Sequence, residues 1–474
     1  MRLILTMTLY NSCGVWILLS LFCAVISFLS SEPKLSDHCF CKLKGRIDDC
    51  SCSVDTVDHF NNMKVFPRLQ SLLNKNYFRF YKVNLKHECP FWSDDSRCAI
   101  RYCHVEPCLE ADIPPGLKGV SSKNAATIKE STNFKYSQAA QNVACEHEFS
   151  RELGYLNTTI SADAYREFAR WKAHDDARDS FCDSEDDHED AEYVDLLLNP
   201  ERYTGYRGEP AHRVWHSIYM ENCFRPKNTY GAYIQSSKLS GMCLEKRVFY
   251  RTISGLHSSI NIHAVSKYLL SDNTSLLGSP EGKWGPNLQE FHRRFDPERT
   301  DGEGPSWLRN LYFLYLLELR ALAKASPFLE REEYFTGNEA EDEEVRLAVR
   351  NFLSVVRSFP DHFNESSMFS GGKQARKLKE EFRQHFRNIS RIMDCVGCDK
   401  CKLWGKLQIQ GLGTALKILF SGKFDSMDPF GNDLSDVSKS KFQLKRGEIV
   451  ALFNAFGRLS TSIVELEKFR EMMR

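Results

Sequence analysis

Three cysteines in the last fifth of the chain have a spacing that suits thiol–disulfide exchange. They form the run Cys395-Val-Gly-Cys398-Asp-Lys-Cys401, just ahead of an apolar segment that we expect to be helical. Two cysteines three residues apart at a helix start lie on one side of the first turn, and they can join as a short disulfide. The helix N-terminus stabilises a thiolate there, and Lys400 and Lys402 add positive charge. A thiolate of low pKa with a partner in reach is what exchange chemistry requires.

Two other interpretations of this run stay open. A structural zinc site would need four nitrogen or sulfur ligands, and Cys-x-x-Cys pairs in such sites commonly come in twos. A second pair of that kind is absent from the sequence. The run could also form inert disulfides, which an oxidising compartment would preserve. Spacing and compartment together favour redox chemistry over both.

A second group of cysteines lies around a polar stretch. Cys98, Cys103 and Cys108 precede it and Cys145 follows it, and from residue 111 to 142 the chain is rich in Ser, Lys, Asn, Gly and Pro. We therefore expect a mobile loop over residues 111–145. Thiols beside such a loop allow several pairings, and an exposed pair could meet the disulfide site of another protein. Permanent disulfides are the alternative, and spacing alone slightly favours them.

A third group has the spacing of a structural clip. Cys39 and Cys41 form one Cys-x-Cys step, and Cys50 and Cys52 form another, with a short turn between them. Nested pairing would close a hairpin here, and we interpret the group as purely structural.

The N-terminus and the cysteine content indicate the secretory pathway. Residues 1–31 show a charged start, an apolar middle and a small-residue end, which is the order of a signal peptide. Fifteen of the 17 cysteines lie beyond it, and an oxidising compartment lets such a set form disulfides. The four sequons, which can carry glycans only on a secreted surface, begin at Asn157, Asn273, Asn364 and Asn388. An uncleaved signal anchor is the alternative to cleavage, and no later stretch is expected to span a membrane.

The elements that must position these cysteines are mostly helices. Helical patterns are predicted over residues 153–171, 193–198, 211–222, 243–270, 307–324, 344–358, 373–393, 402–420 and 445–473. The apolar run 311–317 indicates a fully buried helix. We expect a mainly α protein: one helical domain over residues 32–474, with an irregular, disulfide-rich limb at 39–113 and a helical core at 193–474. The net charge of zero gives no argument for nucleic acid or an anionic membrane.

Several segments, taken together and in order, resemble one family: the endoplasmic reticulum oxidoreductins, which are flavin-dependent thiol oxidases. The similar segments are Cys89-Pro-Phe-Trp92, Cys98-x4-Cys103, residues 192–206 (EYVDLLLNPERYTGY), Ile253-Ser-Gly-Leu-His257, residues 387–398 (RNISRIMDCVGC) and Trp404-Gly-Lys-Leu407. The resemblance runs from Cys39 to near the C-terminus.

The resemblance implies a two-station relay. Cys98 and Cys103 would be an outer shuttle pair, which takes electrons from reduced protein disulfide isomerase. Cys398 and Cys401 would be the inner active pair, which reoxidises the shuttle and passes two electrons to FAD. Molecular oxygen would then accept the electrons and yield hydrogen peroxide. The location implied is the lumen of the endoplasmic reticulum, with a retention partner or peripheral membrane association holding the protein there.

The resemblance also implies structural and regulatory disulfides. The structural pairs would be Cys39–Cys52, Cys41–Cys50, Cys89–Cys395 and Cys223–Cys243. In a switched-off form, Cys98 would pair with Cys145 and Cys103 with Cys108. Long loops add little closure entropy, so alternative pairings can lie close in free energy. Cys182, in an acidic run at residues 175–190, is expected to remain a thiol.

The flavin contacts follow from the same resemblance. The matching positions are Arg202, Thr204, Trp215, Ser254, His257 and Arg294. Ser254 and His257 are three residues apart and so share a helix face, and Arg294 offers a guanidinium for a diphosphate. No Gly-x-Gly-x-x-Gly motif is present, so the expectation is a helix bundle around the flavin rather than a Rossmann fold.

The sequence departs from the family at one position. Members tend to carry Gly-Glu-Gly-Pro-x-Arg-Leu, whereas this chain has Trp307 in place of that arginine. Two outcomes stay open: Arg309 or Arg299 compensates, or the cofactor is held less tightly. Two non-oxidase hypotheses remain alongside the oxidase: a redox-sensitive luminal binding protein without enzymatic activity, and a zinc-binding luminal protein. We expect no metal.

Overall fold

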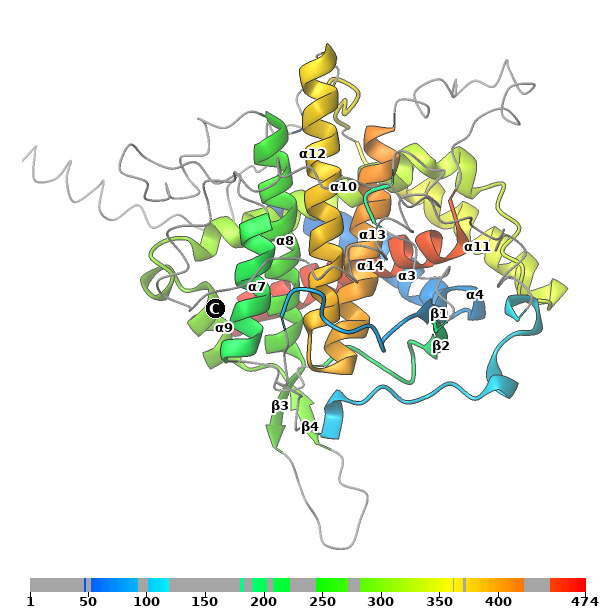
Figure 1. The fold of residues 1–474 in the computed structure, drawn as a ribbon, viewed down its shortest axis with the longest axis horizontal. Helices are drawn as coiled ribbons and strands as arrows, with labels where there is room; N and C mark the ends of the chain where they lie inside the picture. Colours follow the sequence, from blue (N-terminus) through cyan, green and yellow to red (C-terminus); the bar gives the residue numbers. More distant parts are fainter. Residues whose placement is uncertain are drawn as a thin grey trace, which may run out of the picture.

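The computed structural model describes residues 47, 53–92, 101–118, 180–182, 190–202, 208–221, 244–271, 282–360, 362–369, 372–421 and 444–474. Most of these residues are in helices, and two short two-stranded sheets lie beside them (Figure 1). The mainly α fold class expected from the sequence is confirmed.

Some sequence predictions lie outside the described residues. They are the signal peptide, most of the loop at 111–145, the helix at 153–171 and most of the acidic run. The predicted site residues outside are Cys39, Cys41, Cys50, Cys52, Cys98, Cys145, Thr204, Cys223, Cys243, Asn157 and Asn273.

Four long helices form the centre of the molecule. They are α8 (Leu244–Ser266), α10 (Gly304–Leu329), α13 (Asp399–Phe420) and α14 (Arg446–Met472). α13 packs along α14, and α10 packs along α8 and also contacts the other two. Every residue from 311 to 317 in α10 is buried, as its uninterrupted apolar run predicts.

The last of these helices corrects one expectation. α14 is, among the described residues, one helix long and apolar enough to cross a membrane, although no such stretch was expected. Its apolar window is 83% buried inside the protein, which is the behaviour of a core helix. Other helices contact α14 on several sides, namely α3 (Phe66–Leu73), α8, α10 and α13, and this burial explains its many apolar residues.

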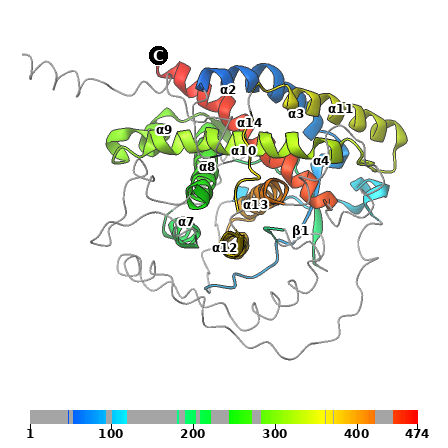
Figure 2. The same cartoon turned by 90° about the horizontal axis from the view of Figure 1, so that it is seen from above.

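Two further helices, α7 (Glu209–Glu221) and α12 (Gly372–Ile392), form a four-helix bundle together with α8 and α13 of the centre. α7 and α12 contact one another, and α12 also contacts α13. Phe249 of α8 stacks on Phe382 of α12 with ring centres 5.0 Å apart. Seen nearly end on in Figure 2, α7, α8, α12 and α13 run alongside one another.

The N-terminal limb is more regular than its cysteine content indicates. It contains α2 (Val54–Phe60), a π-helical turn η1 (Asn61–Val65), α3 (Phe66–Leu73) and α4 (Asn76–Arg79). These helices pack against α14. The expectation of an irregular limb is therefore wrong between residues 54 and 79. Val57, Val65, Leu69 and Leu72 are each at most 1% exposed, and their helical spacing shows why this segment folds onto the core.

Two segments predicted to be helical are strands. β2 (Glu192–Asp195) pairs antiparallel with β1 (Phe80–Val83), so the predicted helix at 193–198 is wrong. α8 ends at Ser266, and β3 (Tyr268–Ser271) pairs with β4 (Lys283–Gly285) in place of the predicted helix end. In both cases a distant or later strand supplies backbone hydrogen bonds that local pattern does not reveal. The β3–β4 hairpin projects from one end of the bundle (Figure 1).

The remaining elements are short except for α11. They are η2 (Arg101–Cys103), η3 (Glu110–Asp112), η4 (Pro115–Leu117), α9 (Leu288–Phe295), η8 (Pro297–Arg299), α11 (Glu339–Arg357) and η9 (Met393–Cys395). Asn287 and Asn338 cap α9 and α11, because each side chain accepts a hydrogen bond from a backbone N–H in the first turn.

Candidate active site

The inner cysteine pair lies at the first turn of α13. Cys398 is the N-cap residue in an extended conformation, and its carbonyl accepts a hydrogen bond from the Lys402 N–H at 2.8 Å. Cys398 is fully buried and Cys401 is partly exposed. Both are present as thiols. The positive end of the helix dipole therefore faces this pair, which favours a thiolate over a thiol.

Of the two lysines predicted to assist, Lys400 lies beside the pair. Burial lowers the pKa of Lys400, Glu106 and the Cys398 sulfur act to raise it, and Arg202 lowers it further. Glu106, Arg202 and Cys398 consequently lie near the Lys400 ammonium. Lys402 is turned elsewhere: its ammonium donates at 3.3 Å to a backbone carbonyl in the segment that follows β1.

A disulfide fixes the chain just ahead of the pair. Cys395, the last residue of η9, is bonded to Cys89 across 306 residues of sequence. This is the pairing that the family resemblance implies. Next to it, Lys406 of α13 lies 2.6 Å from Asp394, and both side chains are buried. The disulfide and the ion pair together hold the turn that leads into α13.

The second cysteine station lies against the first. η2 ends with Cys103, which is 2% exposed and disulfide-bonded. Because every other described cysteine is either a thiol or part of the Cys89–Cys395 bond, its partner lies outside the described residues. η2 contacts α13. His104 Nδ1 lies 3.9 Å from Oδ2 of Asp399, the residue that directly follows Cys398.

An aromatic contact attaches η2 to the β3–β4 hairpin. Tyr102 packs edge-on against Trp284 of β4, with ring centres 5.1 Å apart. The Arg202 guanidinium lies over the Trp284 ring at 5.3 Å. Arg202, one of the predicted flavin residues, thus contacts the hairpin and lies near enough to Lys400 to lower its pKa.

Cys108 follows this segment as a thiol, so the predicted regulatory Cys103–Cys108 bond is not the one present here. Burial raises the pKa of Cys108, and the carboxylates of Asp195 and Asp112 raise it further, against the opposing effect of Arg79. Arg79 is itself paired with Asp195 through two hydrogen bonds. The result is a thiol that is a weak nucleophile in this position.

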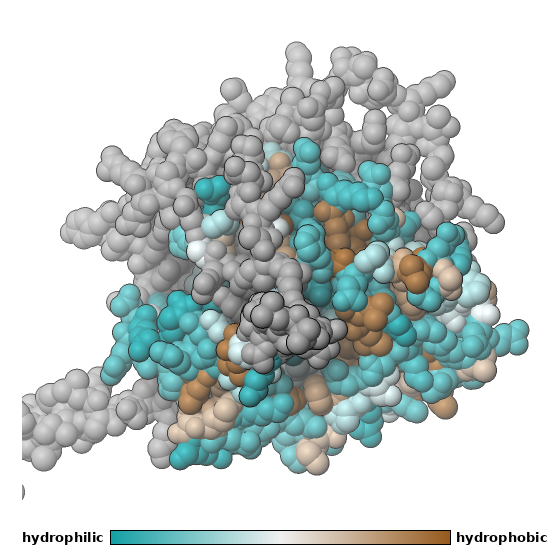
Figure 3. Space-filling model, turned by 90° about the horizontal axis from the view of Figure 1, so that it is seen from below, coloured by the Kyte–Doolittle hydropathy of each residue, from teal (hydrophilic) through white to brown (hydrophobic). Residues whose placement is uncertain are grey.

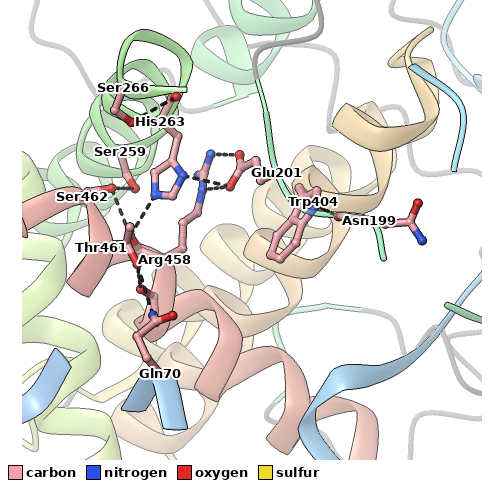
Figure 4. Close-up of polar contacts among 11 residues, drawn as sticks. Gln70, Asn199, Glu201, Ser259, His263, Ser266, Trp404, Arg458, Thr461 and Ser462 are labelled. Atoms are coloured by element: carbon pink, nitrogen blue, oxygen red, sulfur yellow. Dashed lines mark hydrogen bonds and ion pairs between the residues drawn. The ribbon is translucent and has the colours of Figure 1, made fainter. Parts of the chain in front are cut away.

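The segment that follows β2, which belongs to the family-like run 192–206, contacts both cysteine stations through Asn199. Asn199 is fully buried; its Oδ1 accepts from the Glu106 N–H at 2.7 Å, and its Nδ2 donates to the Glu106 carbonyl at 3.0 Å. The Asn199 carbonyl accepts from Trp404 Nε1 at 2.8 Å (Figure 4). Asn199 therefore contacts the chain three residues after Cys103 and three residues after Cys401.

Glu201, two residues after Asn199, belongs to a largely buried cluster of charged and polar side chains. Glu201 forms a two-point ion pair with Arg458 of α14 and lies 3.4 Å from His263 Nδ1 (Figure 4). His263 Nε2 is 3.2 Å from the Arg458 carbonyl. Burial keeps the pKa of His263 well below its usual value. Sequence reasoning missed this cluster, since its members come from three distant segments.

The predicted flavin residues are brought together in part. Trp215 of α7 stacks on His257 of α8, with ring centres 3.7 Å apart and planes 16° from parallel. Tyr219, one turn after Trp215, places its hydroxyl 2.9 Å from His257 Nδ1. Burial lowers the pKa of His257 to about 3, and the positive charge of Arg294 contributes. Tyr219 was missed, although its spacing of four from Trp215 puts both on one helix face.

Ser254 engages a different neighbour from His257. Its hydroxyl accepts from Asn310 Nδ2 of α10 at 2.9 Å, whereas His257 meets α7. Trp307, which stands where family members tend to carry an arginine, is partly exposed. Its carbonyl accepts a hydrogen bond from the Ser258 hydroxyl at 2.8 Å. Two residues further on, burial and the charge of Arg251 lower the pKa of Arg309, so two guanidinium groups lie near each other on α8 and α10.

The other predicted positions are placed as follows. Asn364 is exposed, and Asn388 is partly buried on α12. Cys182 is a buried thiol whose Sγ lies 3.3 Å from the Ile409 carbonyl of α13. Among the described residues, no group of three or more His, Cys, Asp or Glu side chains could hold a metal ion.

A separate pocket of about 470 Å³ lies between α10 and α11. It is lined by Leu316, Leu319, Arg320, Ala323, Val356, Arg357, Phe359, His362 and Phe363. None of the predicted site residues lines it, so the chemistry described above is not located there.

Comparisons with known proteins cover nearly the whole chain. A model of the family Endoplasmic Reticulum Oxidoreductin 1 (ERO1) matches residues 64–466. The chain is 58% identical over 453 residues to an Ero1-like protein of Drosophila melanogaster, covering 94% of this chain and 92% of that one. It is 49% identical over 461 residues to human ERO1-like protein alpha, covering 93% of each.

Solved structures agree. A structure of Ero1p, named there as the source of disulfide bonds for oxidative protein folding in the cell, is 29% identical with a TM-score of 0.53, covering 89% of this chain and 99% of that one. A double-cysteine mutant of S. cerevisiae Ero1p is 28% identical with a TM-score of 0.53, covering 89% and 98%.

Proposed function

Because the chain belongs to the Endoplasmic Reticulum Oxidoreductin 1 family, and so is an oxidoreductase of oxidative protein folding in the endoplasmic reticulum, we propose that it is a FAD-dependent thiol oxidase acting on protein disulfide isomerase. Cys98 and Cys103 form its outer shuttle pair, and Cys398 and Cys401 form its inner pair. Oxygen is the final acceptor, and hydrogen peroxide is the product.

One observation carries this proposal: disulfide-bonded Cys103 lies on η2, which packs against the start of α13, where Cys398 and Cys401 lie. Exchange between two cysteine pairs requires direct contact of sulfur atoms, so the stations must be neighbours. Cys401 is partly exposed while Cys398 is buried. The inner pair and the shuttle segment lie on elements that contact one another, as this exchange requires.

The exchange steps balance without further reactants. A reduced substrate dithiol attacks the Cys98–Cys103 disulfide, leaves as a disulfide, and leaves two thiols on the shuttle. One shuttle thiolate then attacks one sulfur of the inner disulfide and releases the other as a thiolate. The second shuttle thiolate displaces the attacked sulfur, which restores the outer disulfide and leaves an inner dithiol.

The residues on α7, α8 and α9 fit a flavin nucleotide. Trp215 and His257 offer aromatic faces, the neutral imidazole and the Tyr219 hydroxyl offer hydrogen bonds, and Arg294 supplies positive charge for a diphosphate. Arg202, Thr204 and Ser254 are assigned by position. FAD held by these residues would supply the two-electron chemistry that links the inner dithiol to oxygen. Arg309, beside Arg251, is the candidate to replace the arginine lost at Trp307.

The surface near the shuttle suits a protein substrate. Leu109, Leu197 and Leu198 are 66%, 46% and 47% exposed and belong to the segments that carry Cys108 and Asn199. Figure 3, viewed from the hairpin end, shows apolar patches among mainly hydrophilic groups. Exposed apolar groups of this kind are typical of protein interaction sites. The switch that pairs Cys98 with Cys145 and Cys103 with Cys108 would withdraw the shuttle from such a partner.

The test is an absorption spectrum of the purified luminal protein, before and after adding reduced protein disulfide isomerase without air. We expect a flavin band that bleaches, and oxygen consumption that is lost in Cys398→Ser. Cys182→Ala is the matched control, because it removes a thiol that lies against the same helix but belongs to neither station. A colourless, folded protein would instead support the redox-sensitive binding protein, and unchanged turnover in Cys398→Ser would refute the relay.

A further inference from the structure

The segment 199–202 connects three parts of the molecule that must stay in register during electron transfer. Asn199 contacts the backbone of Glu106 on the shuttle side and the indole of Trp404 on α13. Glu201 is paired with Arg458 of α14. We call this segment the bridge. It follows β2 and carries no cysteine.

The geometry of Asn199 is that of a clip rather than of ordinary core packing. The amide oxygen accepts from the Glu106 N–H and the amide nitrogen donates to the Glu106 carbonyl. The side chain therefore makes the same pair of hydrogen bonds to the shuttle segment that a neighbouring β-strand would make. Its Nδ2 also donates to the Asp195 carbonyl at 3.1 Å, which fixes the amide orientation. The residue is fully buried, so water does not compete for these bonds.

The far side of the clip is rigid. Trp404 lies three residues after Cys401 on the same helix, and its indole N–H donates to the Asn199 carbonyl. The Glu201–Arg458 pair, with the Arg458 side chain 2% exposed, ties the bridge to α14. α14 in turn packs along α13. A displacement of Asn199 relative to Cys401 is therefore resisted from two sides.

We infer that Asn199 is a positioning residue that holds the shuttle segment at the inner cysteine pair, so that a shuttle thiolate meets the inner disulfide. The inference rests on the proposed function and deepens it. Asn199 touches no reacting atom; it acts through Glu106, three residues from Cys103. Its effect is confined to the transfer between stations, because a small dithiol can reduce the inner pair without the shuttle.

The experiment compares two substrates in the full-length oxidase. In Asn199→Ala we expect the rate with reduced protein disulfide isomerase to fall roughly tenfold, since small misplacements of reacting groups cost one to two orders of magnitude. The rate with dithiothreitol should stay within about twofold. Asn199→Asp would place an acceptor-only carboxylate oxygen against the buried carbonyls of Glu106 and Asp195, so its rate with the isomerase should fall at least as far as that of Asn199→Ala.

Asn454→Ala is the matched control. Asn454 is buried, and its Nδ2 donates to the carbonyls of Phe78 and Val450, away from both stations. We expect this variant to lose stability while keeping the wild-type ratio of the two rates. Trp404→Phe removes the indole N–H and leaves a smaller aromatic ring in its place, and it provides a second test from the α13 side should Asn199→Ala fail to fold.

Hydrogen exchange gives a readout that does not depend on turnover. Amides in residues 101–110 should exchange several-fold faster in Asn199→Ala than in Asn454→Ala, because the Glu106 N–H loses its buried acceptor. Equal loss of rate with both substrates, or unchanged exchange in this peptide, would overturn the inference and leave the oxidase proposal intact. Wild-type protein that oxidises neither substrate would overturn the proposed function itself.

Discussion

The packing of Cys182 against α13 leads to a prediction that geometry fixes closely. Gly413 lies in the middle of α13, and a Cβ added there would lie 2.1 Å from Cys182 Sγ and 3.1 Å from Phe386 Cε1. Real Cβ atoms do not approach another heavy atom so closely, so one of the partners would have to move. Cys182 cannot move easily, because its sulfur is buried against the Ile409 carbonyl.

The expected cost follows from two opposing effects. Overpacking a tight core site costs about 1–3 kcal/mol, and replacing glycine by alanine within a helix returns about 1 kcal/mol. Gly413→Ala should therefore lower the free energy of unfolding by about 0–2 kcal/mol. Cys182→Ala removes one buried sulfur and should cost about 1 kcal/mol. In the double variant the clash disappears, so its total loss should be no greater than that of Cys182→Ala alone.

Urea unfolding of the four proteins, followed by far-UV circular dichroism, measures this double-mutant cycle. We expect a favourable coupling energy of about 1–3 kcal/mol between the two substitutions. Thiol oxidation should persist in all four proteins, because Gly413 lies three turns away from Cys401 along α13. Additive losses, or a Gly413→Ala variant more stable than the wild type, would show that Cys182 does not fill the space in front of this glycine.

Two further predictions concern titrating groups. His257, with a pKa of about 3 in the folded protein and about 6.5 unfolded, binds a proton only on unfolding as the pH falls between these values. Stability is therefore lost on acidification below pH 6.5 by up to about 1.4 kcal/mol per unit, and His257→Gln should show a shallower fall of thermal midpoint between pH 7 and 5.5; parallel profiles would contradict a neutral buried imidazole. Burial and two carboxylates raise the pKa of Cys108, so iodoacetamide should modify it more slowly at pH 7.5 than a free cysteine, and Asp112→Asn should accelerate the reaction. Mass spectrometry of the alkylated peptide measures this rate, and an unchanged rate in the variant would rule out an effect of Asp112.

The long helices could be predicted because their signals are local. Residues 311–317 are apolar on every side, so α10 was recognised as a buried helix. The helical period in the C-terminal segment likewise gave α14 to within one residue at each end. The short strands could not be recognised this way. β2 is four residues long, and its hydrogen-bonding partner β1 lies more than 100 residues earlier. The leucines that follow β2 resemble a helical run only when this partner is unknown.

The site shows the same division. The cysteine spacing of residues 395–401 indicated exchange chemistry, and the structure places this run at a helix start as the pattern requires. No local pattern indicates that η2 packs on α13, or that Asn199 contacts both stations. The separation between Asn199 and Trp404 is 205 residues. Contacts of this kind depend on the tertiary fold, which residue types and spacing do not specify.

The bridge is attached to α14 through Glu201 and to the shuttle segment through Asn199, and these two attachments differ in strength. The weaker one is where the shuttle segment would separate from the bridge. Glu201 and Arg458 form a largely buried charge pair, and breaking such a pair by removing one partner costs about 3–5 kcal/mol. The contacts between Asn199 and Glu106 are two neutral hydrogen bonds, each contributing about 1 kcal/mol net. A shuttle that must leave the inner pair to meet a protein substrate would therefore separate between Asn199 and Glu106. The bridge itself would stay on α14, with Asn199 in place to receive the shuttle segment again.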